Sequence, residues 1–451
     1  MSLVSMRRCL SIGLLALAFS CRDQPIAEAT LANDLSKAVL EYMQPLLANR
    51  DFAGVICISR GTGLLFQGAW GYAEIAQGVE HTLDSRFAIA SITKSLTAAS
   101  IIKLKTEGRL SYEDAVGRYL PQFTYGDKIK IEHLLRFESG LAEVDADRAF
   151  TSEELLAEIG AQPLVFEPGM DSRYGNSGFD VLAMVVEAIS GMSFGEYLGQ
   201  TFLEPLNMAA SGLRRDLKPP DTGLSAPYVP GPPPELLKRE GYANPFNHFG
   251  SGGMYATARD LGAWGRAVAH KEIVDVFAEA YPWGWGRTEV AGHRGLEQTG
   301  MQTGFVASLQ VFPDEDIVIV MLSNIENGLW VAWSKDLARM VFGEKPLVVP
   351  QLYDYQETLD KDRAASLLGR YALNVGRFVD IREVGGSLWL YLNDYPIGRY
   401  MLPLKDGDFQ LRDFTGHIRF QEDDGKEAPS FTWYLPEVWH VDPEVYTRVE
   451  R

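Results

Sequence analysis

The pattern of apolar residues changes character near residue 364, and this change constrains the fold more than any other feature of the 451-residue chain. Residues 35–345 mix segments of helical spacing with apolar strands. From residue 364 onward, short strands rich in Trp, Tyr, Phe and Val are separated by Gly and Asp turns, which is typical of a sandwich or barrel. We therefore expect an α+β domain at 35–345, a linker at 346–363 and a small all-β domain at 364–451.

The first domain is expected to contain two pairs of strands. Turn residues at 60–63 and at 313–316 each separate two apolar segments with strand spacing. The expected strands are residues 52–58, 63–70, 304–310 and 317–322. Helical spacing is found at residues 35–48, 91–104 and 330–342. The Pro-rich tract at 218–234 interrupts these elements, and we expect it to be a long loop.

The N-terminus has the pattern of an export signal. Arg7 and Arg8 precede an apolar run at 10–19 that is too short to span a bilayer. The run ends in LAFSC at 17–21, which resembles a bacterial lipobox. We expect a signal peptide at 1–21, lipidation of Cys21 and a spacer at 22–34, so that the exported protein is anchored on the periplasmic or outer face of a membrane. The alternative is ordinary cleavage nearby, with Cys21 unmodified.

Composition and motif content exclude several other classes of function. A net charge of −18 without a local Lys/Arg block argues against nucleic acid as a partner. Cys9 leaves with the signal and Cys21 is the lipidation candidate, so Cys57 has no partner and is expected to be a packed thiol. No Cys, His and acidic residues have metal-ligand spacing and no Gly-rich phosphate loop is present, so we expect neither metal nor cofactor.

A Ser-x-x-Lys pattern at Ser91 and Lys94 is the first candidate for chemistry. At this spacing a hydroxyl and an amine share one face of a helix, and a desolvated Lys beside a Ser can act as its base. The pattern recurs at Ser100 and Lys103, nine residues later and half a turn out of phase. Only one pair can face a cleft. Ser91 is favoured because it begins the helix, where free backbone N–H groups stabilise a developing oxyanion.

The motifs around Ser91 follow one another in an order that resembles the serine β-lactamase and penicillin-binding-protein superfamily, closest to its class C and esterase-like branch. The resemblance covers roughly residues 40–342. It rests on FAIASITK at 87–94, EGRLS at 107–111, YLP at 119–121, IEHLL at 131–135, SGL at 139–141, FEPG at 166–169, YGN at 174–176, FLEPLNM at 202–208, GGMYATA at 252–258 and GF at 304–305. In FLEPLNM, Asn207 replaces the usual glycine.

The resemblance implies roles for four residues. Ser91 is expected to be the acylated nucleophile, Lys94 its proton acceptor and Tyr174 the relay of protons to the leaving group and the deacylating water. Asn176 is expected to hold the substrate amide or carbonyl. Other Tyr-x-Asn triplets occur at 242–244, after Pro-rich sequence, and at 391–393, in the all-β region. Tyr174 is preferred because it follows the Glu-Pro-Gly turn and precedes an apolar helix.

The third element that the resemblance implies is a strand beginning with Lys-Thr-Gly or His-Thr-Gly. The equivalent positions are Gln298, Thr299 and Gly300, and the Met301 N–H is expected to complete an oxyanion hole with that of Ser91. Gln298 departs from the family because a neutral amide supplies no cationic field for a substrate carboxylate. The competing alignment places 293–295 at this site, although His293 is expected on the turn before the strand.

The resemblance also implies the fold and the class of activity. The first domain is expected to be an antiparallel sheet flanked by helices with an all-α subdomain, and the second to be lipocalin-like. The expected activity is hydrolysis of an ester or amide through an acyl-enzyme, on a small-molecule or peptidoglycan-like substrate, as in esterases, D-amino-acid peptidases and β-lactamases. The alternative is a penicillin-binding-like sensor or binding module with little turnover.

Overall fold

The computed structural model describes most of the chain from residue 34 to residue 449. The residues outside the described part are 1–33, 145–149, 218–222, 240–247, 280, 282, 303, 356–358, 375, 394–397, 413–416, 422–427, 429, 435–442 and 450–451. The expected signal peptide with Cys21 and the triplet at 242–244 therefore lie outside the described residues.

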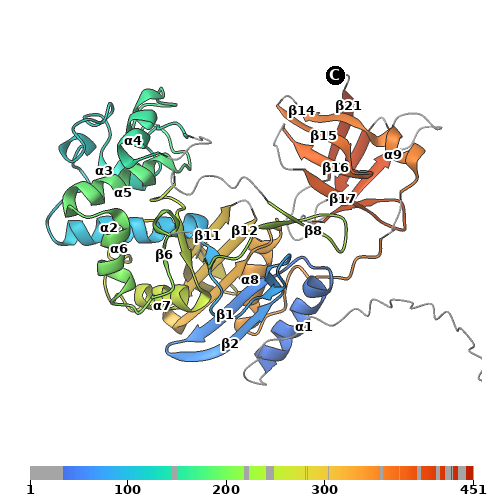
Figure 1. Cartoon of the computed structure of the whole chain (residues 1–451), viewed down its shortest axis with the longest axis horizontal. Helices are drawn as coiled ribbons and strands as arrows, with labels where there is room; N and C mark the ends of the chain where they lie inside the picture. Colours follow the sequence, from blue (N-terminus) through green and yellow to red (C-terminus); the bar gives the residue numbers. More distant parts are fainter. Residues whose placement is uncertain are drawn as a thin grey trace, which may run out of the picture.

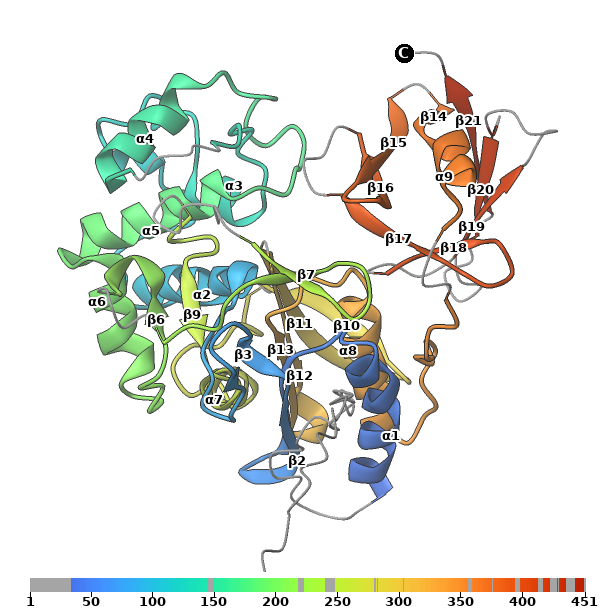
Figure 2. The ribbon, with the colours of Figure 1, turned by 45° about the vertical axis from the view of Figure 1, so that its right-hand side comes forward.

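The first domain is built on a six-stranded antiparallel sheet in the order β10–β11–β12–β13–β1–β2 (Figures 1 and 2). Its strands are β1 (Gly54–Arg60), β2 (Gly63–Trp70), β10 (Gly286–Val290), β11 (His293–Gln302), β12 (Phe305–Phe312) and β13 (Ile317–Ser323). The two expected hairpins are present, and β1 and β13 join them at the centre of the sheet. Both β12 and β13 are buried along their whole length, as strands covered on both faces must be.

Helices cover both faces of this sheet. Figure 2 shows α1 (Asp34–Ala48) and α8 (Trp330–Val341) on one side, and α2 (Thr93–Thr106) and α7 (Ala258–Ala269) on the other. Successive side chains of β13 alternate between the two cores: Ile319 packs in the core with Trp333 of α8, and Val320 in the core with Trp264 of α7. The fold class predicted from the sequence, an α+β domain with an antiparallel sheet, is confirmed.

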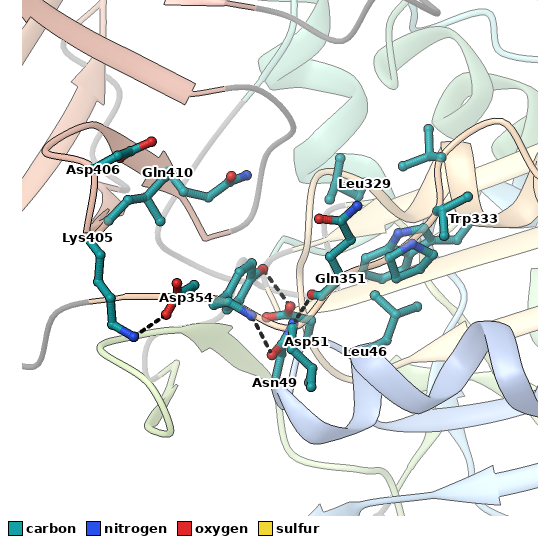
Figure 3. A pocket seen from close by; sticks show the side chains of 16 residues that line it. Leu46, Asn49, Asp51, Leu329, Trp333, Gln351, Asp354, Lys405, Asp406 and Gln410 are labelled. Carbon is teal, nitrogen blue, oxygen red and sulfur yellow. Dashed lines mark hydrogen bonds and ion pairs between the residues drawn. The ribbon is translucent and has the colours of Figure 1, made fainter.

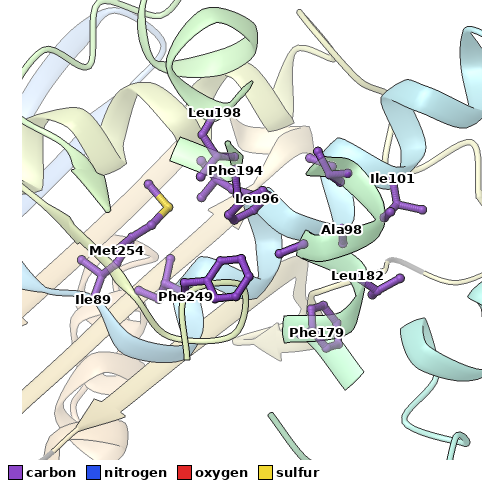
Figure 4. Close-up of a cluster of buried hydrophobic side chains, with 14 of the residues drawn as sticks. Ile89, Leu96, Ala98, Ile101, Phe179, Leu182, Phe194, Leu198, Phe249 and Met254 are labelled. Carbon is purple, nitrogen blue, oxygen red and sulfur yellow. The ribbon is translucent and has the colours of Figure 1, made fainter. Parts of the chain in front are cut away.

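The all-α subdomain lies between β5 and β6 in the sequence. It contains α3 (Ile131–Leu135), α4 (Ser152–Ala161), α5 (Ser177–Ser190) and α6 (Phe194–Leu198). Figure 4 shows Leu96 and Ala98 of α2 in one apolar cluster with Phe179 of α5 and Phe194 of α6. This packing fixes the start of α5 against α2, the two helices that carry candidate site residues.

A second, smaller sheet lies next to the candidate nucleophile. It has the order β5–β9–β6, with β5 (Phe87–Ala88), β9 (Met254–Ala256) and β6 (Gly212–Leu213). The remaining short strands of this domain are β3 (Tyr72–Glu74), β4 (Val79–Glu80), β7 (Tyr228–Pro230) and β8 (Leu236–Lys238). Because β5 ends just before Ser91 and β9 begins just after Ser251, their pairing brings two distant segments together.

The C-terminal part is a closed barrel of eight strands in consecutive order (Figure 1). The strands are β14 (Gly369–Asn374), β15 (Arg377–Val384), β16 (Ser387–Leu392), β17 (Arg399–Pro403), β18 (Phe409–Leu411), β19 (His417–Gln421), β20 (Ser430–Tyr434) and β21 (Glu444–Val449). Pairing of β14 with β21 closes the barrel. An eight-stranded up-and-down barrel is the lipocalin architecture, so the expected lipocalin-like domain is confirmed.

Two details differ from the sequence-based expectations. The helix α9 (Lys361–Leu367) crosses the expected boundary at residue 364. Asp360 caps its N-terminus, and Leu367 at its C-terminal end packs into the barrel core. The Pro-rich tract is not all loop, because β7 lies within it and pairs with β8. Buried Tyr228 and Val229 anchor this hairpin, and a proline is compatible with its edge position.

A buried arginine joins the barrel to the first domain. Arg412, just after β18, is fully buried, and its Nε lies 3.3 Å from Asp51 Oδ1. Its guanidinium also donates to the carbonyls of Asn49, Gly231 and Glu235 at 2.5–2.6 Å. Beside this contact lies a cleft of about 680 Å³ (Figure 3), lined by Leu46 and Trp333 on the α1/α8 side and by residues of the barrel.

No single helix among the described residues is long and apolar enough to cross a membrane; one bent pair, Ser177–Ser190 with Phe194–Leu203, meets the criteria of length and composition together. The first helix of that pair is largely buried within the domain.

Candidate active site

A tight turn between β5 and α2 presents Ser91. The turn is a 3₁₀ helix, Ala90–Ile92, in which Ala90 takes a left-handed φ of 46° and Ser91 is partly exposed between two buried neighbours. Strand β11 passes very close to it, because a Cβ added to Gly300 would lie 2.2 Å from the Ile89 carbonyl oxygen. Glycine at position 300 is therefore required for β11 to lie against the turn.

Lys94 lies one turn further along and is completely buried. Its Nζ is within hydrogen-bond distance of three oxygens: Ser91 Oγ at 3.1 Å, Asn176 Oδ1 at 2.7 Å and the Ser251 carbonyl at 2.9 Å. The Asn176 and Ser251 oxygens can only accept, whereas the Ser91 hydroxyl can donate or accept. The two obligate acceptors therefore fix two N–H bonds of the amine. The third position on the nitrogen, a lone pair in the neutral amine or an N–H bond in the ammonium, then points toward Ser91.

Tyr174 approaches Ser91 from the other side. Its Oη donates to Ser91 Oγ at 2.7 Å, and its ring lies 4.9 Å from Lys94 Nζ and 5.0 Å from the ring of Phe137. The turn that carries Tyr174 is held by Glu143, whose Oε1 accepts from the backbone N–H of Asn176 at 2.8 Å. Three side chains predicted from the sequence thus converge on one oxygen or on its lysine neighbour.

Gln298 links β11 to the nucleophile turn. Its Nε2 donates to the Ser91 carbonyl at 3.1 Å and to the Gly284 carbonyl at 2.8 Å, while its Oε1 accepts from Thr299 N. Both amide hydrogens are therefore used by protein carbonyls. Gly300 and Met301 follow on the strand, with Gly300 buried and the Met301 side chain exposed.

The competing alignment places its residues elsewhere on the same strand. His293 is the first residue of β11 rather than part of the preceding turn, and its ring stacks on Phe342 while Nδ1 lies 2.5 Å from Glu315. Arg294 is exposed and lies opposite Glu289 of β10. It lies four positions before Gln298, about 13 Å along a strand, so it adds no positive charge next to Ser91.

The second Ser-x-x-Lys pair is not assembled into a site. The Ser100 hydroxyl is fully buried and donates to the Leu96 carbonyl at 2.8 Å. Lys103 forms an ion pair with Glu107 at 3.1 Å instead. The third Tyr-x-Asn triplet begins in β16 of the barrel, at Tyr391.

Sequence reasoning missed three groups that hold the site. They are the Ser251 carbonyl, the Glu143 carboxylate and the Gly284 carbonyl. Two are backbone atoms, which no side-chain pattern reveals. Ser251 directly precedes the GGM motif and Glu143 closely follows the SGL motif, so proximity to a motif was the available signal for both.

Among the described residues, no group of three or more His, Cys, Asp or Glu side chains is arranged to hold a metal ion. The chemistry that the described arrangement supports is proton exchange among a hydroxyl, an amine and a phenol. A serine oxygen in direct contact with a potential base is the arrangement of a nucleophile in acyl transfer.

Comparison with known proteins identifies the family. Residues 39–337, well over half of the chain, match the family model described as Beta-lactamase. The chain belongs to the β-lactamase family. It is accordingly a β-lactamase-related serine hydrolase, similar to penicillin-binding proteins, and the matched region contains every candidate catalytic and substrate-binding residue from Ser91 to Met301.

The β-lactamase-family domain has similar curated and solved relatives. Over 182 residues the chain is 32% identical to penicillin-binding protein 4* of Bacillus subtilis (strain 168), a match that covers 38% of this chain and 40% of that protein. The chain thus spans less than half the length of that relative.

Two solved structures share the β-lactamase-family fold. The octameric penicillin-binding protein homologue from Pyrococcus abyssi is 20% identical, with a TM-score of 0.60 and coverage of 92% of this chain and 99% of that one. D-amino acid amidase from Ochrobactrum anthropi SV3 is 17% identical, with a TM-score of 0.61 and coverage of 69% and 98%. At these identities the likeness shows the fold.

Proposed function

We propose that this protein hydrolyses an ester or amide through an acyl-enzyme formed on Ser91. The observation that carries the proposal is that Ser91 Oγ lies within hydrogen-bond distance of both Lys94 Nζ and Tyr174 Oη, at 3.1 and 2.7 Å. In the neutral amine, two N–H bonds are taken by obligate acceptors, so the lone pair faces the Ser91 hydroxyl. That is the orientation required of a general base.

The proposed reaction has two stages. In acylation, Ser91 Oγ attacks the carbonyl carbon, its proton passes to Lys94 and then through Tyr174 to the leaving alcohol or amine, and the ester or amide bond breaks. In deacylation, Tyr174 takes a proton from water while passing its own proton to the neutral Lys94 amine. The resulting hydroxide attacks the acyl-enzyme, and Lys94 returns the proton to Ser91 Oγ as the acid leaves. The N–H groups of Ser91 and Met301 would bind the oxyanion, and Asn176 the acyl group.

Gln298 narrows the substrate class. Because its amide carries no charge and both its hydrogens are bound to protein carbonyls, it offers a substrate carboxylate no cation and no spare donor. We therefore propose substrates without a carboxylate beside the scissile bond. The names of similar proteins, a D-amino acid amidase and a penicillin-binding protein, are compatible with an amide or peptide substrate.

Active-site labelling tests the proposal. A fluorophosphonate probe should label the wild-type protein and the Ser100→Ala variant equally, and should fail to label Ser91→Ala. A fluorescent penicillin should label the wild type more slowly than the fluorophosphonate does. Equal labelling of Ser91→Ala would refute the nucleophile, and no labelling of any variant by either probe would favour a sensor without turnover. Rates on p-nitrophenyl esters, D-amino-acid anilides and nitrocefin then separate the substrate classes.

We also propose that the protein is exported and anchored through Cys21. The support is the sequence pattern of residues 1–21 alone. Radiolabelled palmitate should be incorporated into the wild-type protein in a bacterial host and not into Cys21→Ala; equal incorporation into both would refute the anchor.

A further inference from the structure

A buried carboxylate is connected to the candidate base through one intervening residue, Ser251. Asp180, in the first turn of α5, is 1% exposed and lies beneath the turn formed by residues 248–251. Its Oδ1 accepts from the backbone N–H groups of Gly250 and Ser251, both at 3.0 Å. Its Oδ2 accepts from Ser251 Oγ at 3.2 Å. Two of these contacts hold Ser251 itself and the third holds its neighbour Gly250, and the Ser251 carbonyl accepts from Lys94.

The same turn is clamped from the other side by α2. Thr97 Oγ1 donates to the Gly250 carbonyl at 2.5 Å. A Cβ at Gly250 would lie 2.4 Å from the Phe179 carbonyl oxygen, so only glycine lets the turn pack this closely on α5. The turn therefore spans the gap between the helix that carries Lys94 and the helix that carries Asp180.

We propose that Asp180 is a positioning residue for catalysis: by fixing the Ser251 carbonyl it orients Lys94, so that the lone pair of the neutral amine faces the Ser91 hydroxyl. This inference rests on the proposed function, since it assigns a role to Lys94 as base. Without the carbonyl, only Asn176 Oδ1 would hold the amine from a fixed direction. The amine would then rotate or move away from Ser91 Oγ.

The side chain of His248 also faces Asp180. His248 Nδ1 lies 3.3 Å from Asp180 Oδ2. Burial lowers the pKa of His248 and the charge of Lys94 opposes its protonation. The hydrogen bond to Asp180 and the negative charges of Asp180 and Glu143 outweigh these effects, so the pKa of His248 lies above its ordinary value. Asp180 thus has the imidazole of His248 as a neighbour in addition to three hydrogen-bond donors.

The chain offers a matched control in Asp260. This residue also lies in the first turn of a helix, α7, and is 5% exposed. Its Oδ2 accepts from the Ala210 backbone N–H at 3.0 Å and from Ser211 Oγ at 2.7 Å. Asp260 therefore anchors a turn by contacts of the same kind as those of Asp180, with one backbone N–H group fewer, but no hydrogen bond links that turn to Lys94 in the described residues.

The experiment compares kinact and KI of the fluorophosphonate for Asp180→Ala, Asp180→Asn and Asp260→Ala. Displacement of the base by about 1 Å costs up to about a hundredfold, so kinact of Asp180→Ala should fall by about that factor with KI unchanged. Asp180→Asn keeps an oxygen for both backbone N–H groups and should recover kinact to within about fivefold of wild type. Asp260→Ala should keep wild-type kinact, although its unfolding midpoint falls like that of Asp180→Ala.

Three outcomes would overturn the proposal. They are a wild-type kinact in Asp180→Ala, an equal loss in Asp260→Ala, or no recovery in Asp180→Asn. A crystal structure of Asp180→Asn or Asp180→Ala decides the question independently of labelling: an unmoved Ser251 carbonyl and Lys94 Nζ in the alanine variant would refute positioning. Failure of the proposed function is distinguishable, because it would appear as labelling that persists in Ser91→Ala or as a wild-type protein that takes up neither probe.

Discussion

Replacement of Gln298 by lysine is the most informative perturbation of substrate choice. Gln298 Nε2 lies 3.1 Å from the Ser91 carbonyl and 2.8 Å from the Gly284 carbonyl. A lysine ammonium in this place finds the same two acceptors and keeps one further N–H bond for a substrate. The change therefore adds one positive charge beside the nucleophile without removing the contact between β11 and the Ser91 turn.

The magnitude follows from Coulomb's law. A carboxylate about 4 Å from an ammonium gains about 4 kcal/mol at an effective dielectric constant of about 20. Residue 298 is partly exposed, so water and salt reduce this gain to about 1–2 kcal/mol. Since 1.36 kcal/mol corresponds to a factor of ten, kcat/KM for a carboxylate-bearing β-lactam should rise about tenfold in Gln298→Lys.

The assay measures kcat/KM for nitrocefin and for an uncharged p-nitrophenyl ester, each at low and high salt. The nitrocefin value should rise about tenfold and the rise should shrink in high salt, whereas the ester value should stay within about threefold. Gln298→Met is the matched control, because it keeps the side-chain length and should lower both rates. A flat or lower nitrocefin value in Gln298→Lys would show that residue 298 does not occupy the position of the family cation.

Two further predictions concern stability. Arg412→Met should lower the free energy of unfolding in urea by about 3–5 kcal/mol, because it leaves the buried Asp51 carboxyl group without its cationic partner. The double variant with Asp51→Asn should recover part of this loss. Burial lowers the pKa of His81 to about 4, although its hydrogen bond to Asn324 opposes the shift. The folded protein thus favours neutral His81, and the free energy of unfolding should fall by about 3 kcal/mol as the pH drops from about 6.5 to about 4. The variant His81→Gln should lose this pH dependence of the free energy of unfolding.

Each stability prediction has a clear contrary result. An Arg412→Met variant with wild-type unfolding in urea would show that the buried pair does not contribute to stability. An equal pH slope in wild type and His81→Gln would assign the acid sensitivity to other groups.

The sequence specified most of the local structure and the identity of the polar groups. Alternating apolar residues around short turns predicted the β1–β2 and β12–β13 hairpins, because pairing across a short turn depends on neighbouring residues. The spacing of Ser91 and Lys94 predicted that both side chains lie on one helical face, because that arrangement also depends only on residues close in the sequence. The motif order led to the family, which the comparison confirmed. Helix α9 and strand β7 were missed because buried contacts with distant segments stabilise them.

The tertiary structure alone decided how the site is held together. No spacing relates Lys94 to the carbonyl of Ser251, which is 157 residues away, or relates Gln298 to the backbone of Ser91. These contacts exist because α2 packs on α5 and because β11 lies against the 3₁₀ turn that carries Ser91. Neither contact with a backbone carbonyl can be recognised from the residue types. The sequence by itself determined which side chains are available for chemistry. The packed fold determined which of them lie within hydrogen-bond distance of one another.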